Sequence, residues 1–70
     1  MTKLRLINEA ITLAGSTEAR LFGTDSYAEI AEARARWVAW IDRQPPGYEA
    51  DSWQDCFRDW KRSMEKLRPG

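Results

Sequence analysis

Apolar residues recur at helical spacing in three long segments of the chain, the first of which is LRLINEAITLA. Apolar side chains three and four residues apart define one side of this segment, and the other side is polar. Thr2 stands where a helix N-cap is expected, and Gly15 stands where a glycine commonly ends a helix. The pattern predicts a helix over residues 3–14. Its predicted apolar side consists of Leu4, Ile7, Ala10, Ile11 and Ala14, widened by Leu6 and Leu13.

The longest helical pattern begins at a capping box formed by Ser26 and Glu29 and stops before Pro45 and Pro46. It predicts a helix over residues 26–43. Large side chains form one stripe of this helix: Tyr27, Ile30, Trp37, Val38 and Ile41, with Ala33 and Trp40 at its edge. Small side chains form a second stripe beside it: Ala28, Ala31, Ala35 and Ala39. Two such stripes predict a central helix with several neighbours, one of which can approach closely against the alanines.

A third helix is predicted over residues 52–67, where Ser52 and Asp55 form another capping box. Its apolar side chains fall within an arc of roughly a hundred degrees, which is typical of a single packing seam. They are Trp53, Cys56, Phe57, Trp60, Met64 and Leu67. Before the central helix, the segment STEARLFG predicts one short helical turn over residues 17–22, closed by Gly23. Leu21 and Phe22 of this turn are expected to close the end of the bundle.

The predicted fold class is therefore all-α: a small three-helix bundle with one extra short helical turn, in a single domain over residues 1–70. The helices at residues 26–43 and 52–67 are expected to lie antiparallel across the loop QPPGYEAD. A chain of this length buries little apolar surface unless a metal, disulfides or a second chain add to it. A homodimer, formed through the surface of residues 26–43 or the seam of residues 52–67, is one predicted way to complete the core.

Composition narrows the function classes. Eleven basic residues balance eleven acidic ones, so no net charge attracts nucleic acid or an anionic membrane. The chain has no histidine, and its only cysteine is Cys56, which excludes an internal disulfide and a zinc site of the usual ligand set. We therefore expect no metal and no cofactor. No apolar run approaches the length of a membrane span and no signal-peptide core is present, so we expect a cytoplasmic protein, in the host cytoplasm for a viral gene.

Catalysis is not expected either. Acid–base chemistry at neutral pH usually needs histidine or a carboxylate pair held in a pocket, whereas the carboxylates here fall at helix caps or on solvated faces. Cys56 lacks a histidine that could activate it as a nucleophile. We predict that the protein is not an enzyme and has no catalytic residues.

The alternative of nucleic-acid binding depends on the basic outer face of the last helix. The candidate contacts are Arg58, Lys61, Arg62 and Lys66. Acidic residues interrupt this face at positions 55, 59 and 65, which is typical of a solvated surface with ion pairs. A small DNA-associated regulator or an excisionase-like accessory protein is therefore the second hypothesis. A structural part of a virion is the third.

Arg34 interrupts the apolar side of the central helix, in the stretch ARARWVAWIDR. A lone charge is not tolerated inside a core, so Arg34 must pair with an acid or face a partner. The acids predicted for a pair are Glu49, Asp51 and Asp55.

The other prediction is a recognition surface, because tryptophan, tyrosine and arginine are enriched where binding energy concentrates. Trp53, Phe57 and Trp60 are expected in the core, whereas Trp37 and Trp40 lie at the outer margin of the helix. The predicted partner-binding residues are Arg34, Arg36, Trp37, Trp40 and Tyr48. These residues predict a small non-enzymatic module for protein–protein interaction that occupies the surface of a protein partner. By analogy of size and composition alone, it resembles inhibitors encoded by phages and mobile elements, such as anti-CRISPR proteins.

Overall fold

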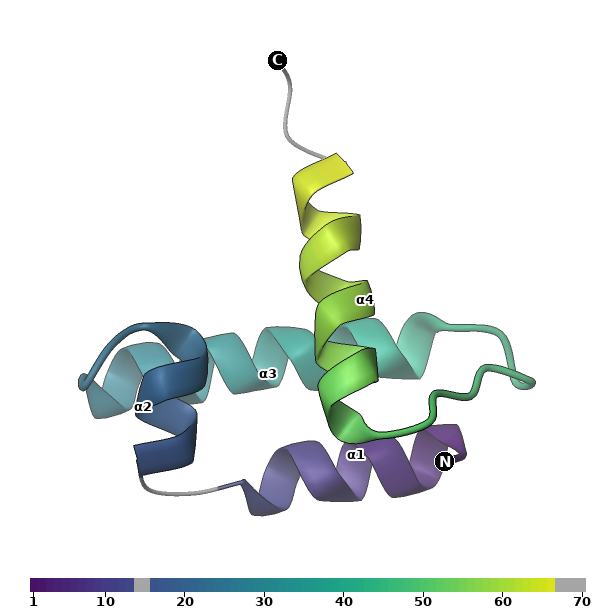
Figure 1. Ribbon diagram of the computed structural model, residues 1–70, viewed down its shortest axis with the longest axis horizontal. Helices are drawn as coiled ribbons and strands as arrows, with labels where there is room; N and C mark the ends of the chain where they lie inside the picture. Colours follow the sequence, from purple (N-terminus) through teal and green to yellow (C-terminus); the bar gives the residue numbers. More distant parts are fainter. Residues whose placement is uncertain (14–15, 67–70) are drawn as a thin grey trace.

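The computed structural model describes residues 1–13 and 16–66 and contains four helices in that part of the chain (Figure 1). They are α1 (Lys3–Thr12), α2 (Ser16–Phe22), α3 (Tyr27–Arg43) and α4 (Trp53–Lys66). The described residues form no strand, and one isolated β-bridge joins Thr2 to Glu49. The predicted all-α class, with three main helices and one short one, is confirmed.

The helices begin where the local sequence predicts. Thr2 Oγ1 accepts a hydrogen bond from the backbone N–H of Arg5 at 3.4 Å, and Ser26 Oγ does the same for Glu29 at 3.4 Å. Ser52 Oγ accepts from the N–H of Asp55 at 3.3 Å. Each hydroxyl satisfies one of the N–H groups that a first helical turn leaves without a partner.

The helices end close to the predicted residues. Helix α1 stops at Thr12, two residues earlier than predicted, because the backbone of Leu13 is already extended. Gly23 ends α2 with a φ of +72°, a conformation that side-chain-bearing residues rarely adopt. The predicted roles of Ala14, Gly15 and Leu67 lie outside the described residues.

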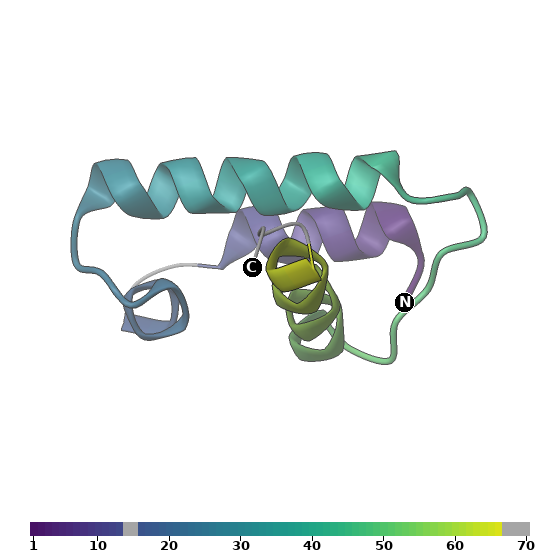
Figure 2. The same ribbon diagram turned by 90° about the horizontal axis from the view of Figure 1, so that it is seen from above.

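Helices α1 and α3 lie side by side and antiparallel, and α4 crosses them steeply (Figures 1 and 2). The prediction that α3 and α4 are antiparallel is wrong. The reason is that the loop between them is tied to the beginning of the chain. The Met1 ammonium donates to the carbonyl of Ala50 at 2.6 Å, and Lys3 Nζ donates to the carbonyls of Asp42 and Gln44 at 2.9 and 2.7 Å. Helix α4 therefore starts beside α1 instead of turning back along α3.

The core lies where α4 crosses the other helices. Its buried side chains are Leu6, Ala10, Trp37, Ile41, Cys56 and Trp60. Trp37 lies at the centre of an aromatic cluster, with ring centroids 5.3 Å from Phe57, 6.2 Å from Trp60 and 6.4 Å from Trp53. Trp60 is buried, as expected, and Trp53 and Phe57 pack against the core while remaining partly exposed. At the end of the bundle Phe22 meets Phe57 at 5.8 Å.

Some residues predicted for the core lie at the surface. On α1 the chain buries Leu6 and Ala10, whereas Leu4 is 82% exposed and Ile11 is 55% exposed. Tyr27, at the first position of α3, is 90% exposed. The apolar side of α1 is wider than the area that α3 and α4 cover, so one edge of it faces away from the core.

Candidate functional site

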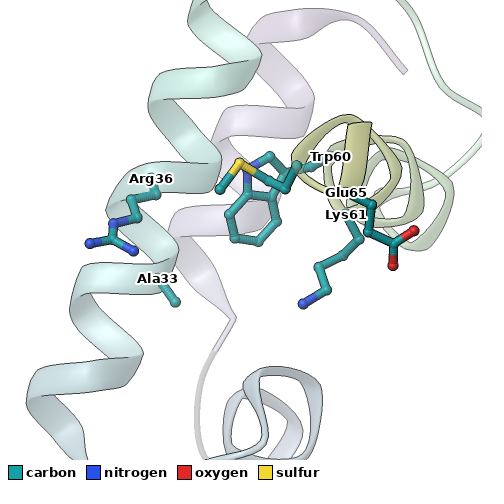
Figure 3. A pocket seen from close by; sticks show the side chains of 6 residues that line it. Ala33, Arg36, Trp60, Lys61 and Glu65 are labelled. Carbon is teal, nitrogen blue, oxygen red and sulfur yellow. The ribbon is translucent and has the colours of Figure 1, made fainter. Parts of the chain in front are cut away.

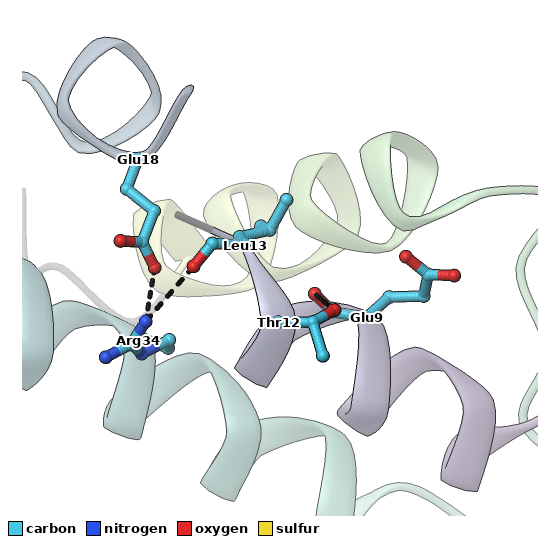
Figure 4. A network of polar contacts seen from close by, with 5 residues as sticks. All are labelled: Glu9, Thr12, Leu13, Glu18 and Arg34. Carbon is cyan, nitrogen blue, oxygen red and sulfur yellow. Dashed lines mark hydrogen bonds and ion pairs between the residues drawn. The ribbon is translucent and has the colours of Figure 1, made fainter. Parts of the chain in front are cut away.

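Arg34 is held by an ion pair inside the chain. Its Nη1 donates to a carboxylate oxygen of Glu18 on α2 and to the carbonyl oxygen of Leu13 at 3.2 Å, just after α1 (Figure 4). The Glu18 side chain is 8% exposed and the Arg34 side chain 31%. The three predicted acids, Glu49, Asp51 and Asp55, are therefore the wrong partners. The ion pair joins α2 to the middle of α3, and the hydrogen bond to Leu13 joins α3 to the segment just after α1.

Trp37 belongs to the core and not to the predicted recognition surface, because its exposed area is 0%. It points into the aromatic cluster, where rings from α4 surround it. Its Nε1 is buried and has no hydrogen-bond partner among the described residues. An unpaired buried N–H costs free energy, so the burial of the indole ring must outweigh that cost.

Trp40 and Tyr48 lie together at the border between α3 and α4. Their ring centroids are 5.6 Å apart with the rings nearly perpendicular, and both side chains are half-buried. Trp40 Nε1 donates to Ser63 Oγ at 3.3 Å, and the Tyr48 hydroxyl donates to the Asp59 carboxylate at 2.9 Å. Both polar tips are thereby held on α4, which fixes the two rings in one orientation.

A groove of ≈ 420 Å³ runs between α3 and α4 beside Trp40. We call it the α3–α4 groove; its lining residues are Glu32, Ala35, Arg36, Ala39, Trp40, Arg43, Trp60 and Met64. It adjoins a hollow of ≈ 250 Å³ that shares Arg36, Trp60 and Met64 with it. Figure 3 shows Trp60 between the two helices, with Arg36 on the α3 side and Lys61 and Glu65 on the α4 side. Met64 is 41% exposed here, although its spacing predicts a core position.

The α3–α4 groove contains Arg36 and Trp40 of the predicted partner-binding residues, whereas Arg34, Trp37 and Tyr48 do not line it. Sequence reasoning missed Met64 and Arg43. Met64 lies one turn after Trp60, which was predicted for the core, and Arg43 lies one turn after Trp40, so the 3–4 spacing carried part of the signal. The missing information was the direction in which α4 crosses α3.

Three basic side chains, Arg36, Arg43 and Lys61, and two acidic ones, Glu32 and Glu65, line the groove and the adjoining hollow. Arg36 pairs with Glu32 at 2.5 Å, and both side chains are more than 60% exposed, so the pair adds little stability. Arg43 and Lys61 make no ion pair within residues 1–13 and 16–66. A partner with acidic groups next to an apolar side chain would therefore find complementary charge here.

The basic residues of α4 proposed for nucleic-acid contact are all exposed: Arg58, Lys61, Arg62 and Lys66. Arg58 forms an ion pair with Asp55 at 3.5 Å, and Lys61 lines the hollow that adjoins the α3–α4 groove. Of the four candidates, Arg58 is therefore in an ion pair, Lys61 lines the hollow, and Arg62 and Lys66 are exposed on α4.

Burial raises the pKa of the Tyr48 hydroxyl far above its ordinary value of 10.0, and the neighbouring Cys56 and Asp59 raise it further. Burial also raises the pKa of the Cys56 thiol above its ordinary value of 9.0, although the neighbouring Tyr48 partly opposes this shift. A buried thiol with a raised pKa holds little thiolate and is a poor nucleophile. Among the described residues, no three histidine, cysteine, aspartate or glutamate side chains lie close enough to hold a metal ion.

The raised pKa values predict that the protein loses stability in alkali. Both groups bind a proton more tightly in the folded state, so their contribution is complete below the unfolded pKa values and is lost as pH rises through the folded ones. We expect the free energy of unfolding to fall from about pH 9 upward, and to fall less steeply in Tyr48→Phe, which has no phenol to ionise. Urea titrations across this range measure both slopes. Equal slopes for the two proteins would contradict the prediction.

Comparison with known proteins gives no match: no protein-family model, no curated protein and no solved structure matches the chain. No helix in the described part of the chain is long and apolar enough to cross a membrane.

Proposed function

We propose that the protein is a non-enzymatic module that binds a protein partner through the α3–α4 groove. The observation that carries this proposal is the exposed apolar surface of Met64 beside the fixed ring of Trp40, in a concave site. A hollow with aromatic walls suits one large apolar side chain of a partner, and rigid aromatic walls lose little conformational entropy on binding.

The partner segment that fits this site is amphipathic, with an apolar anchor and acidic neighbours. Arg36 and Arg43 lie two turns apart along α3, and Lys61 of α4 lines the adjoining hollow. Complementary charges of this kind act mainly on association rate and specificity. A chain of 8.1 kDa that covers a partner surface in this way can inhibit that partner by steric exclusion, and we propose inhibition by occlusion as its mode of action.

The test is affinity capture, with nuclease treatment, from extracts of the cells in which the gene is found. Wild-type bait is compared with Met64→Glu, which places a carboxylate in the groove, and with Tyr27→Glu as the matched control. Tyr27 is 90% exposed and lies outside the groove, so both changes replace an exposed apolar side chain with the same acid. We expect Met64→Glu to capture at least about tenfold less partner than Tyr27→Glu. Equal capture by the two variants would disprove the groove as the binding site.

Nucleic-acid binding stays the second candidate because Arg62 and Lys66 are exposed on α4 and make no ion pair among the described residues. The same experiment separates it from the first. Proteins bridged by nucleic acid are lost on nuclease treatment, and the double variant Arg62→Glu with Lys66→Glu would lose them without nuclease.

A further inference from the structure

We infer that a second copy of this chain covers the face formed by α1 and α3, which adjoins the α3–α4 groove at Ala35 and Ala39. We call it the α1–α3 face; its apolar members are Leu4, Ile7, Ile11, Ala31, Ala35 and Val38. The inference concerns self-association and does not rest on the proposed function.

The α1–α3 face is the largest set of exposed aliphatic side chains in the described structure. Leu4 and Ile11 are 82% and 55% exposed and lie two turns apart on α1, with Ile7 between them. Beside them Ile7, Ile11 and the small side chains of α3 line a shallow hollow of ≈ 490 Å³. A contiguous apolar patch of this kind on a small protein usually marks an interaction surface.

The charges at the two ends of this hollow point to a second copy as the occupant. Arg34 lies one turn before Val38 on α3 and Asp42 lies one turn after it, and both line the hollow. A two-fold axis through the position of Val38 makes the two α3 helices antiparallel and sets each charge about 6 Å from the axis. It therefore places Arg34 opposite the partner's Asp42, and Asp42 opposite the partner's Arg34. A parallel arrangement would oppose like charges.

Both charged groups are available for this contact. The two hydrogen bonds of Arg34 within the chain use Nη1, and its side chain is 31% exposed. Asp42 is exposed and makes no ion pair within the described residues. Alanines at positions 31 and 35 remove the bulk that would otherwise keep two α3 helices apart.

A second copy also buries additional apolar surface, of which the single chain buries little. The buried apolar residues among those described are only seven: Leu6, Ala10, Ile30, Trp37, Ile41, Cys56 and Trp60. Domains of this size commonly need an additional source of burial, and no disulfide is available because Cys56 is the only cysteine.

The test is the oligomeric state of the purified chain, measured by light scattering and by sedimentation over a range of concentrations. We expect a mass of twice 8.1 kDa at about 100 μM chain, with a thermal midpoint that rises with concentration. A monomer throughout this range would overturn the inference.

Two variants locate the interface, each with little effect on the monomer. Asp42→Lys places a like charge opposite Arg34 twice per dimer, and Ile11→Lys places a charge in the apolar patch. Both positions are in the last turn of a helix, where the helix dipole favours a positive charge. We expect each to raise the dimer dissociation constant at least about tenfold. Glu65→Lys, which makes the same charge change in the last turn of α4 and outside the face, should leave it unchanged. A dimer that Asp42→Lys and Ile11→Lys do not weaken uses another surface and overturns the inference.

Discussion

Replacing Trp37 with alanine should abolish cooperative folding of the protein. Removing a fully buried tryptophan side chain costs about 3–5 kcal/mol in the free energy of unfolding. A chain of 70 residues has a total stability of only about 4–10 kcal/mol, and small single cores commonly lie at the low end. We therefore expect urea titrations followed by far-UV circular dichroism to show a weak, broad transition or none at all.

The large cost follows from the position of Trp37 in the aromatic cluster. Its ring touches three aromatic side chains of α4, so the alanine variant loses the packing that holds α4 across α3. Tyr27→Ala is the control, because Tyr27 is on the same helix and 90% exposed, and should change the free energy of unfolding by less than about 0.5 kcal/mol. Trp37→Phe should retain more stability than Trp37→Ala, because it keeps a ring and removes the N–H that has no partner. A wild-type transition in Trp37→Ala would show that the cluster does not hold the fold.

The sequence allowed the helices to be predicted within about two residues because their limits depend on local contacts. Ser26 and Ser52 each accept a hydrogen bond from an N–H three residues later, and Pro45 lies two residues after the end of α3 at Arg43. Such signals act within one helical turn and do not depend on the rest of the fold. The relative placement of α4 is different, because it follows from hydrogen bonds between Met1 and Ala50, which are 49 residues apart.

The error on Trp37, which was predicted together with Trp40 for the recognition surface, has the same origin. The two residues are three positions apart on α3 and lie on the same margin of its apolar stripe. The helical period alone therefore fits a core position equally well for both residues. Because α4 crosses α3 instead of running along it, its rings cover Trp37 completely and leave Trp40 half-buried at the groove. The α3–α4 groove exists only because of this crossing, and no pattern along the chain could have indicated it.

The apolar side of α1 could be recognised from the sequence, but its buried edge could not. Leu6 and Ala10 lie on one edge and Leu4 and Ile11 on the other, and both edges fit the helical period. The contact with α3 selects the first edge. The second edge remains at the surface. An apolar pattern that is wider than one packing contact can cover therefore indicates an interaction surface.

Arg34→Ala should lower the free energy of unfolding by about 2 kcal/mol, which is less than the cost of breaking a fully buried pair because Arg34 is partly exposed. The loss arises at Glu18, whose side chain is only 8% exposed and would be left without its ion-pair partner. The carbonyl of Leu13 would lose its Arg34 donor as well. The sequence predicted acids near α4 as partners of Arg34. It could not indicate Glu18, because the contact between α2 and α3 depends on how the short helix α2 folds back against α3.

Arg36→Ala is the matched control, since it makes the same substitution two residues away on α3. Arg36 and Glu32 are both more than 60% exposed, so this change should cost less than about 0.5 kcal/mol. Adding Glu18→Gln to Arg34→Ala should recover part of the lost free energy of unfolding, because glutamine keeps the shape of the side chain and needs no cationic partner. Urea titrations of the three variants and of wild type measure these differences. Arg34→Ala and Arg36→Ala could instead lose similar amounts of stability, with no recovery in the double variant. That result would show that the ion pair between α2 and α3 does not stabilise the fold, and Arg34 would again be a candidate recognition residue.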